Sequence, residues 1–74
     1  MVKENSMEFY VIKNEDDKYF ISFGYKNSKE TAIFSSVPFL FQIESEDLAI
    51  KYQRNIEHYG IKCMIVKVKM EEIE

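Results

Sequence analysis

His58 and Cys63 are the only histidine and the only cysteine in this 74-residue chain. A cysteine beside a histidine can form a nucleophilic pair, in which the imidazole accepts the proton of the thiol. The surrounding pattern favours a structural role for both residues. His58 falls at the end of a helical pattern, where it can interact with the helix dipole, and Cys63 falls within a strand pattern as a small apolar residue. We therefore expect that the protein is not an enzyme and has no catalytic residue.

The residue types and their spacing also argue against a metal or phosphate site. One histidine and one cysteine cannot complete a tetrahedral zinc site without distant carboxylates. Gly24 and Gly60 stand alone rather than in a glycine-rich phosphate loop. Acidic clusters at residues 15–17 and 44–47 suit a hairpin turn and the start of a helix. We expect no cofactor and no metal.

The clearest signal for a scaffold lies in residues 45–70. Apolar residues at three- and four-residue spacing predict one helical stripe: Leu48, Ala49, Tyr52, Ile56 and Tyr59. Ser45 is a suitable N-cap, and Gly60 can adopt the left-handed conformation that ends a helix. From Ile61 to Met70 the apolar period changes to two, which is typical of a strand.

The strand predicted at residues 61–70 has two different faces. One face is apolar throughout and carries Met64, Val66, Val68 and Met70. The other is apolar only in its first half and carries Ile61, Cys63, Ile65, Lys67 and Lys69. We expect the helix to pack on Met64, Val66 and Val68, because the other arrangement would press two lysines into the core.

Residues 8–13, 19–25 and 31–35 are rich in aromatic and β-branched side chains and predict three further strands, separated by polar turns. Pro38 interrupts regular pairing, and residues 39–43 are expected to be irregular, with Leu40 and Ile43 filling the core. The order β-β-β-α-β predicts an α+β fold. We expect a three- to four-stranded, mostly antiparallel sheet with one helix on one face, and a last strand that pairs with the first.

A chain of 74 residues has room for a single hydrophobic core, so we expect one domain. Residues 1–6 are expected to be a flexible leader and residues 71–74 a solvated acidic tail. A single cysteine fits a reducing compartment, and no apolar run is long enough to cross a membrane. These features predict a cytoplasmic protein that does not bind membranes.

One helix cannot cover both faces of a sheet whose strands are apolar on both sides. The residues expected on the uncovered face are Tyr10, Ile12, Ile21, Phe23, Ile61, Cys63 and Ile65. An exposed apolar patch usually marks an interface, so these residues are the predicted contact site for a protein partner or for a second copy in a homodimer. The alternative is that residues 39–41 or the N-terminal leader fold over this face and leave nothing exposed.

Nucleic-acid binding is the second functional hypothesis, because tyrosines and lysines on an open sheet can stack and neutralise a single strand. The candidate residues are Tyr10, Tyr19, Tyr25, Lys13, Lys18, Lys26, Lys62, Lys67 and Lys69. The formal net charge of −3 argues against this function, because phosphate binding needs a clustered cationic surface.

The sequence also resembles a loosely defined group of small phage- and prophage-encoded accessory proteins. The resemblance rests on the F-Y-V-I-K hairpin strand, the F-S-S stretch, the positions Leu40, Ile43, Ser45 and Ala49, and the I-V-K-V strand after the glycine. Those proteins usually have Ala and Phe where this chain has Leu40 and Ile43. The resemblance implies a non-enzymatic protein that binds host or phage machinery in a bacterial cytoplasm, for example as an inhibitor of a defence enzyme such as a CRISPR nuclease. It assigns no active residue.

Overall fold

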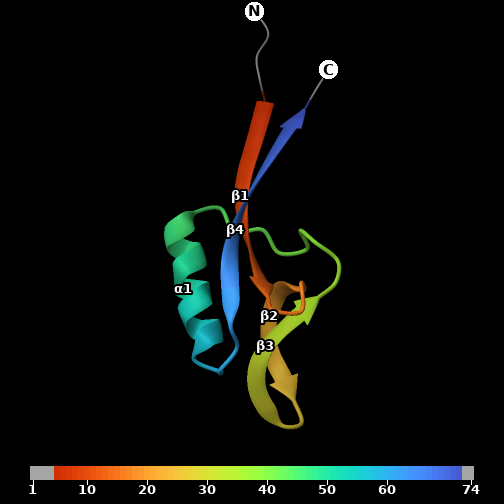
Figure 1. Cartoon of the computed structure of the whole chain (residues 1–74), viewed down its shortest axis with the longest axis vertical. Helices are drawn as coiled ribbons and strands as arrows, with labels where there is room; N and C mark the ends of the chain where they lie inside the picture. The colour runs from red at the N-terminus through yellow and green to blue at the C-terminus, as the bar shows by residue number, and fades with distance from the viewer. Residues whose placement is uncertain (1–4, 73–74) are drawn as a thin grey trace, which may run out of the picture.

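The computed structural model describes residues 5–72. Its elements are β1 (Asn5–Asn14), β2 (Tyr19–Lys26), β3 (Lys29–Ser35), α1 (Glu46–Glu57) and β4 (Cys63–Glu72). The strands form one antiparallel sheet in the order β3-β2-β1-β4, with the helix on one face (Figure 1). This confirms the predicted α+β fold and the pairing of the last strand with the first. No helix among the described residues is long and apolar enough to span a membrane.

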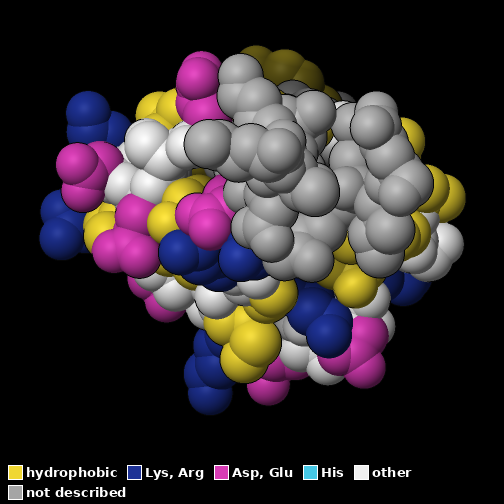
Figure 2. Space-filling view, turned by 90° about the horizontal axis from the view of Figure 1, so that it is seen from above, with side chains coloured by type: hydrophobic (Ala, Val, Ile, Leu, Met, Phe, Trp, Pro, Cys, Tyr) yellow, Lys and Arg dark blue, Asp and Glu magenta, His cyan; other side chains and the backbone are white. Residues whose placement is uncertain are grey.

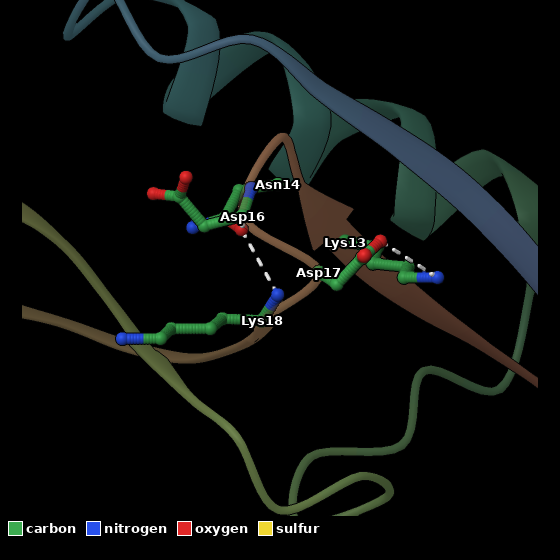
Figure 3. A network of polar contacts seen from close by, with 5 residues as sticks. All are labelled: Lys13, Asn14, Asp16, Asp17 and Lys18. Atoms are coloured by element: carbon green, nitrogen blue, oxygen red, sulfur yellow. Dashed lines mark hydrogen bonds and ion pairs between the residues drawn. The ribbon is translucent and has the colours of Figure 1, made fainter.

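The turn between β1 and β2 is held by the side chain of Asn14 (Figure 3). Its Oδ1 accepts hydrogen bonds from the backbone N–H groups of Asp16 and Lys18, each at 3.0 Å. Asp17 adopts a positive φ of 59°, and its carboxylate lies 3.2 Å from the Lys13 ammonium. An asparagine that bonds to the backbone just after it stabilises a turn of this kind, so the acidic cluster at residues 15–17 serves the hairpin.

The turn between β2 and β3 is a two-residue loop. Lys26 pairs with Lys29, and the residues between them, Asn27 and Ser28, have φ values of 54° and 64°. Two consecutive positive φ values define a type I′ turn, whose twist matches that of an antiparallel hairpin.

The helix begins and ends where its capping residues predict. Ser45 Oγ accepts a hydrogen bond from the backbone N–H of Leu48 at 3.2 Å, and Gly60 has a φ of 81°. Ala49 and Ile56 are completely buried against the sheet. The last helical residue is Glu57, and the chain turns into β4 a few residues later.

The helix packs on the opposite face of β4 from the one that the sequence pattern predicts. Ile61, Cys63 and Ile65 pack against the buried cluster that contains Ala49 and Ile56. The expectation that Met64, Val66 and Val68 face the helix is therefore wrong. That expectation assumes that a helix packed on the Ile61, Cys63 and Ile65 face would also bury Lys67 and Lys69. In the structure, β1 and β4 continue past the helix as a two-stranded arm (Figure 1).

The arm explains why those lysines do not enter the core. The Lys67 side chain is 56% exposed, and its Nζ lies 3.4 Å from Glu8 Oε2 on the neighbouring strand. A helix of 12 residues spans about 18 Å at 1.5 Å per residue, whereas a strand of ten residues spans about 33 Å. The helix therefore covers only part of the strand pair.

Most of the predicted contact site lies on the helix side of the sheet. Tyr10, Ile12, Phe23, Ile61, Cys63 and Ile65 all belong to the core under the helix or pack against it. Their expected place on an uncovered face is wrong, because the helix lies on their side of the sheet. Ile21, beside the irregularity between Phe20 and Ser22, is half-buried and is not part of that cluster.

The segment between β3 and the helix contributes to both faces of the sheet. The Phe41 ring packs on Phe20 and Tyr52 on the helix side, with ring centroids 5.6 and 5.2 Å away. Ile43 is 1% exposed and forms a two-way backbone bridge with Tyr10, as expected of a core plug. Leu40 was expected to fill the core but is 61% exposed.

The two ends of the chain are more regular than the sequence suggests. β1 begins at Asn5 and β4 runs to Glu72, so both strands extend into the segments expected to be a leader and a tail. The rest of those segments, residues 1–4 and 73–74, lies outside the described residues.

The burial of the helix predicts a clear difference between two positions on it. We expect Ile56→Ala to lower the free energy of unfolding by about 2–5 kcal/mol, because it removes a fully buried side chain and leaves a cavity. Leu48→Ala, at a position that is 37% exposed, serves as the control and should cost less. Urea denaturation followed by circular dichroism measures both. Equal losses would contradict the observed orientation of the helix.

Candidate functional site

The sheet face opposite the helix carries a continuous apolar surface on β1 and β4. Antiparallel partners share a face, and the register pairs Met7 with Met70, Phe9 with Val68, Val11 with Val66 and Lys13 with Met64. We call the apolar members of these pairs the methionine face: Met7, Phe9, Val11, Met64, Val66, Val68 and Met70. Every member other than Phe9 and Val11 is at least partly exposed.

The methionines are the most exposed part of the methionine face. Met7, Met64 and Met70 are 61%, 58% and 49% exposed. Figure 2, viewed from above, shows hydrophobic side chains reaching the surface between groups of acidic and basic ones. Methionine side chains are flexible and polarizable, and they adapt to irregular apolar partners. The methionine face can therefore bind an apolar surface of another molecule through side-chain packing.

Phe39 covers one part of the methionine face. Its ring packs edge-on against Phe9, with centroids 5.5 Å apart, and tilts against Tyr19 at 6.4 Å. Phe9 is consequently only 3% exposed although it lies on the side opposite the helix. Phe39 thus covers part of the sheet face opposite the helix, and the cover stops short of the methionines.

The loop that carries Phe39 adds exposed apolar residues of its own. Val37 is 51% exposed, Leu40 is 61% exposed, and Phe39 itself remains 38% exposed. Phe39 has a φ of 66°, a left-handed conformation that costs about 1 kcal/mol or more for a residue other than glycine. The contacts of its ring with Phe9 and Tyr19 offset this strain.

Cys63 is held in a structural environment on the helix side of β4. Gln53 Nε2 donates a hydrogen bond to the Cys63 carbonyl at 3.2 Å, and Cys63 Sγ lies 4.0 Å from the Gln53 carbonyl oxygen. Burial, and to a smaller extent the charge of Glu57, raises the pKa of the Cys63 thiol above its usual value. A raised pKa lowers the fraction of reactive thiolate at neutral pH.

His58 lies in a different place from Cys63. It caps the C-terminal end of α1, and its ring packs edge-on to Tyr59 with centroids 6.3 Å apart. It lines a surface depression of about 310 Å³ with Glu30 and Tyr59, whereas Cys63 lines one of about 140 Å³ near the β1–β2 turn. The candidate nucleophile and base therefore line separate depressions.

The polar groups around His58 join the helix to the sheet. Tyr59 Oη donates a hydrogen bond to Glu30 Oε1, which links the end of the helix to β3. This bond, together with burial, raises the pKa of the Tyr59 phenol. No group of three or more histidine, cysteine or acidic residues that could hold a metal is found in the described part of the chain.

The tyrosines do not form an exposed stacking platform. Tyr10 packs against the core. The Tyr19 ring contacts Phe39, and the Lys13 ammonium lies 6.0 Å from its centroid. Tyr25 is 75% exposed, in the hairpin that projects away from the arm (Figure 1). The residues predicted for base stacking are thus distributed over separate parts of the structure.

Comparison with models of known protein families, with curated proteins and with solved structures finds no match to this chain. The candidate site is therefore supported by the geometry of this structure alone. Sequence reasoning missed the methionine face because it assigned Met64, Val66 and Val68 to the core. A usable signal was present in the lengths of the elements, since the predicted helix is shorter than the strand that it was expected to cover.

Thiol reactivity tests which face of β4 is open. We expect iodoacetamide to modify Cys63 about tenfold more slowly in the folded protein than in urea, because the thiol is shielded and its pKa is raised. The matched variant Cys63→Ala/Met64→Cys moves the thiol to the exposed face and should react nearly as fast folded as unfolded. Mass spectrometry measures both rates, and the reverse order would contradict the observed faces.

The contacts of Phe39 predict a second difference between neighbours. We expect Phe39→Ala to lower the free energy of unfolding by about 1–3 kcal/mol, because Phe9 and Tyr19 lose their cover. Leu40→Ala removes a side chain that is 61% exposed and should change stability by less than about 0.5 kcal/mol. Urea denaturation measures both, and a larger loss for Leu40→Ala would show that the loop is packed differently.

Proposed function

We propose that this protein is a non-enzymatic protein-binding module whose contact surface is the methionine face. The observation that carries the proposal is the exposure of Met7, Met64 and Met70 on a sheet face whose centre, at Phe9 and Val11, is already buried. Exposed apolar patches rimmed by polar residues are typical of protein interaction sites. Aromatic residues and methionine are enriched in such interfaces.

Charged groups at one end of this surface suit a polar rim. Lys13, the partner of Met64 in the register, has a side chain that is 30% exposed and ion-paired with Asp17. A rim of this kind contributes orientation and specificity, whereas the apolar centre supplies most of the affinity. The surface therefore suits a folded protein partner with an apolar patch of its own.

Binding of a larger macromolecule would work by occlusion, because the described residues offer an apolar surface and hold His58 and Cys63 in separate depressions. The resemblance to phage- and prophage-encoded accessory proteins supports the finer proposal of an inhibitor in a bacterial cytoplasm, with a defence enzyme such as a CRISPR nuclease as one kind of target. Self-association into a homodimer belongs to the same proposal, since a second copy is also a protein partner.

Differential capture from bacterial lysate tests this function. We expect immobilised protein to retain a specific partner, and Met64→Lys to abolish that retention because it places a charge in the apolar contact. Arg54→Ala, on the exposed side of the helix, is the matched control and should retain the same partner. Mass spectrometry of the eluates identifies the proteins, and circular dichroism shows that each variant is folded.

Two results would contradict the proposal. Equal retention by the protein and by Met64→Lys would show that the methionine face is not the contact surface. Retention that disappears after nuclease treatment, or that falls steeply with salt on single-stranded DNA, would support nucleic-acid binding instead.

A further inference from the structure

The C-terminal end of α1 lies beside the β2–β3 hairpin (Figure 1), and a surface depression of about 310 Å³ opens between them. We call it the helix-end depression. Phe23 and Glu30 line it from the hairpin, and Asn55, His58 and Tyr59 line it from the helix and the residues just after it. Sites for small ligands have volumes of roughly 300–1,000 Å³, so this depression has room for one small ligand group.

Aromatic rings form the apolar part of the helix-end depression. The centroids of the Phe23 and Tyr59 rings are 6.0 Å apart, and the ring planes are inclined at 50°. Phe23 also packs on Phe20 and Tyr52, at 5.0 and 6.2 Å, and these contacts hold its ring in place. The face of an aromatic ring carries partial negative charge and attracts cations. Two rings inclined in this way can contact a single cationic group.

Glu30 supplies a carboxylate with an available oxygen. Its Oε1 accepts the hydrogen bond of the Tyr59 hydroxyl, and no other described residue forms a hydrogen bond or an ion pair with this carboxylate. The same hydrogen bond is the main cause of the raised pKa of Tyr59. No lysine or arginine is among the described residues that line the depression. The Oε2 atom is therefore left to pair with a cation from outside the chain.

The register of the hairpin keeps its lysines away from this carboxylate. Glu30 pairs with Tyr25, whereas Lys29 pairs with Lys26 in the next position of the ladder. Neighbouring residues of a strand point to opposite faces, so both lysines lie on the other face of the hairpin from Glu30. The formal net charge of the chain, −3, also favours the approach of a cation.

We propose that the helix-end depression binds an alkylated ammonium group, as in choline or in a trimethyl-lysine side chain of another protein. The Phe23 and Tyr59 rings contact the alkyl groups, and the Glu30 carboxylate pairs with the positive charge. An ammonium without alkyl groups is strongly hydrated and needs an acceptor for each N–H, which aromatic rings supply poorly. The depression lies on the helix side of the sheet, so this binding goes beyond the function proposed for the methionine face and does not depend on it.

Titration with choline tests the aromatic contact. We expect the methyl proton resonances of choline to move upfield in the presence of the protein, because protons above an aromatic ring are shielded. The backbone amide resonances of Asn55, His58 and Tyr59 should shift during the same titration. The matched probe is the neutral carbon analogue of choline, in which a tert-butyl group replaces the trimethylammonium group. It should bind at least tenfold more weakly, and equal binding of the two probes, or no upfield shift, would overturn the proposal.

Two variants locate the charge that binds the probe. Glu30→Gln keeps an acceptor for the Tyr59 hydroxyl but removes the carboxylate charge, and it should weaken choline binding at least tenfold. Glu57→Gln removes the same charge from an exposed helix residue outside the lining and should bind choline as the unmodified protein does. Circular dichroism shows that both variants are folded. Unchanged binding by Glu30→Gln, or equal weakening by the two variants, would contradict the assigned site.

A comparison of two probes distinguishes the sources of the ammonium group. A peptide with one trimethyl-lysine between glycines is titrated in the same way as choline. At least tenfold tighter binding of the peptide would identify a protein side chain as the ligand, and tighter or equal binding of choline would identify a free small molecule. Failure of both probes to bind would overturn the proposal and would leave the function of the methionine face untouched.

Discussion

The structure depends on a difference in length between its helix and the strands beneath it. A helix of 12 residues covers about 18 Å, and β1 and β4, with ten residues each, run for about 33 Å. Where the helix lies, the residues beneath it are apolar and pack with the core, as Cys63 and Ile65 do. Beyond the helix, the same face of the strands carries Glu8 and Lys67, which form an ion pair in solvent. The helix-side face of β4 thus has two environments, and only the part under the helix belongs to the core.

The loop before the helix completes both sides of the sheet. Phe41 and Ile43 close the helix side, and Phe39 turns the other way and covers Phe9. The cover is small compared with the face, so Met64 and Met70 remain exposed at positions well separated along β4. The chain therefore provides its own core and leaves a defined apolar surface for contact. The proposed function follows from that surface.

The local structure could be predicted from the sequence because local rules determine it. Ser45, Gly60 and the polar turn residues mark the ends of elements through capping and backbone preferences that act within a few residues. The faces of β4 could not be assigned in the same way. Burial of Lys67 and Lys69 was judged as though the helix covered the whole strand, and that premise put Met64 in the core and Ile65 outside it. The conformation of Phe39 could not be predicted either, because no local sequence preference favours a left-handed phenylalanine. Its ring is held in place by residues that are distant in the sequence.

The side of β4 on which the helix packs can be measured directly in solution. Nuclear Overhauser effects from the buried methyl groups of Ala49 and Ile56 report which strand residues they contact. We predict strong cross-peaks to Ile12 and Ile65 and none to the methyl group of Met64. Strong cross-peaks from Ala49 to Met64 and Val66, with none to Ile65, would contradict this arrangement and place the exposed surface on the other side of the sheet.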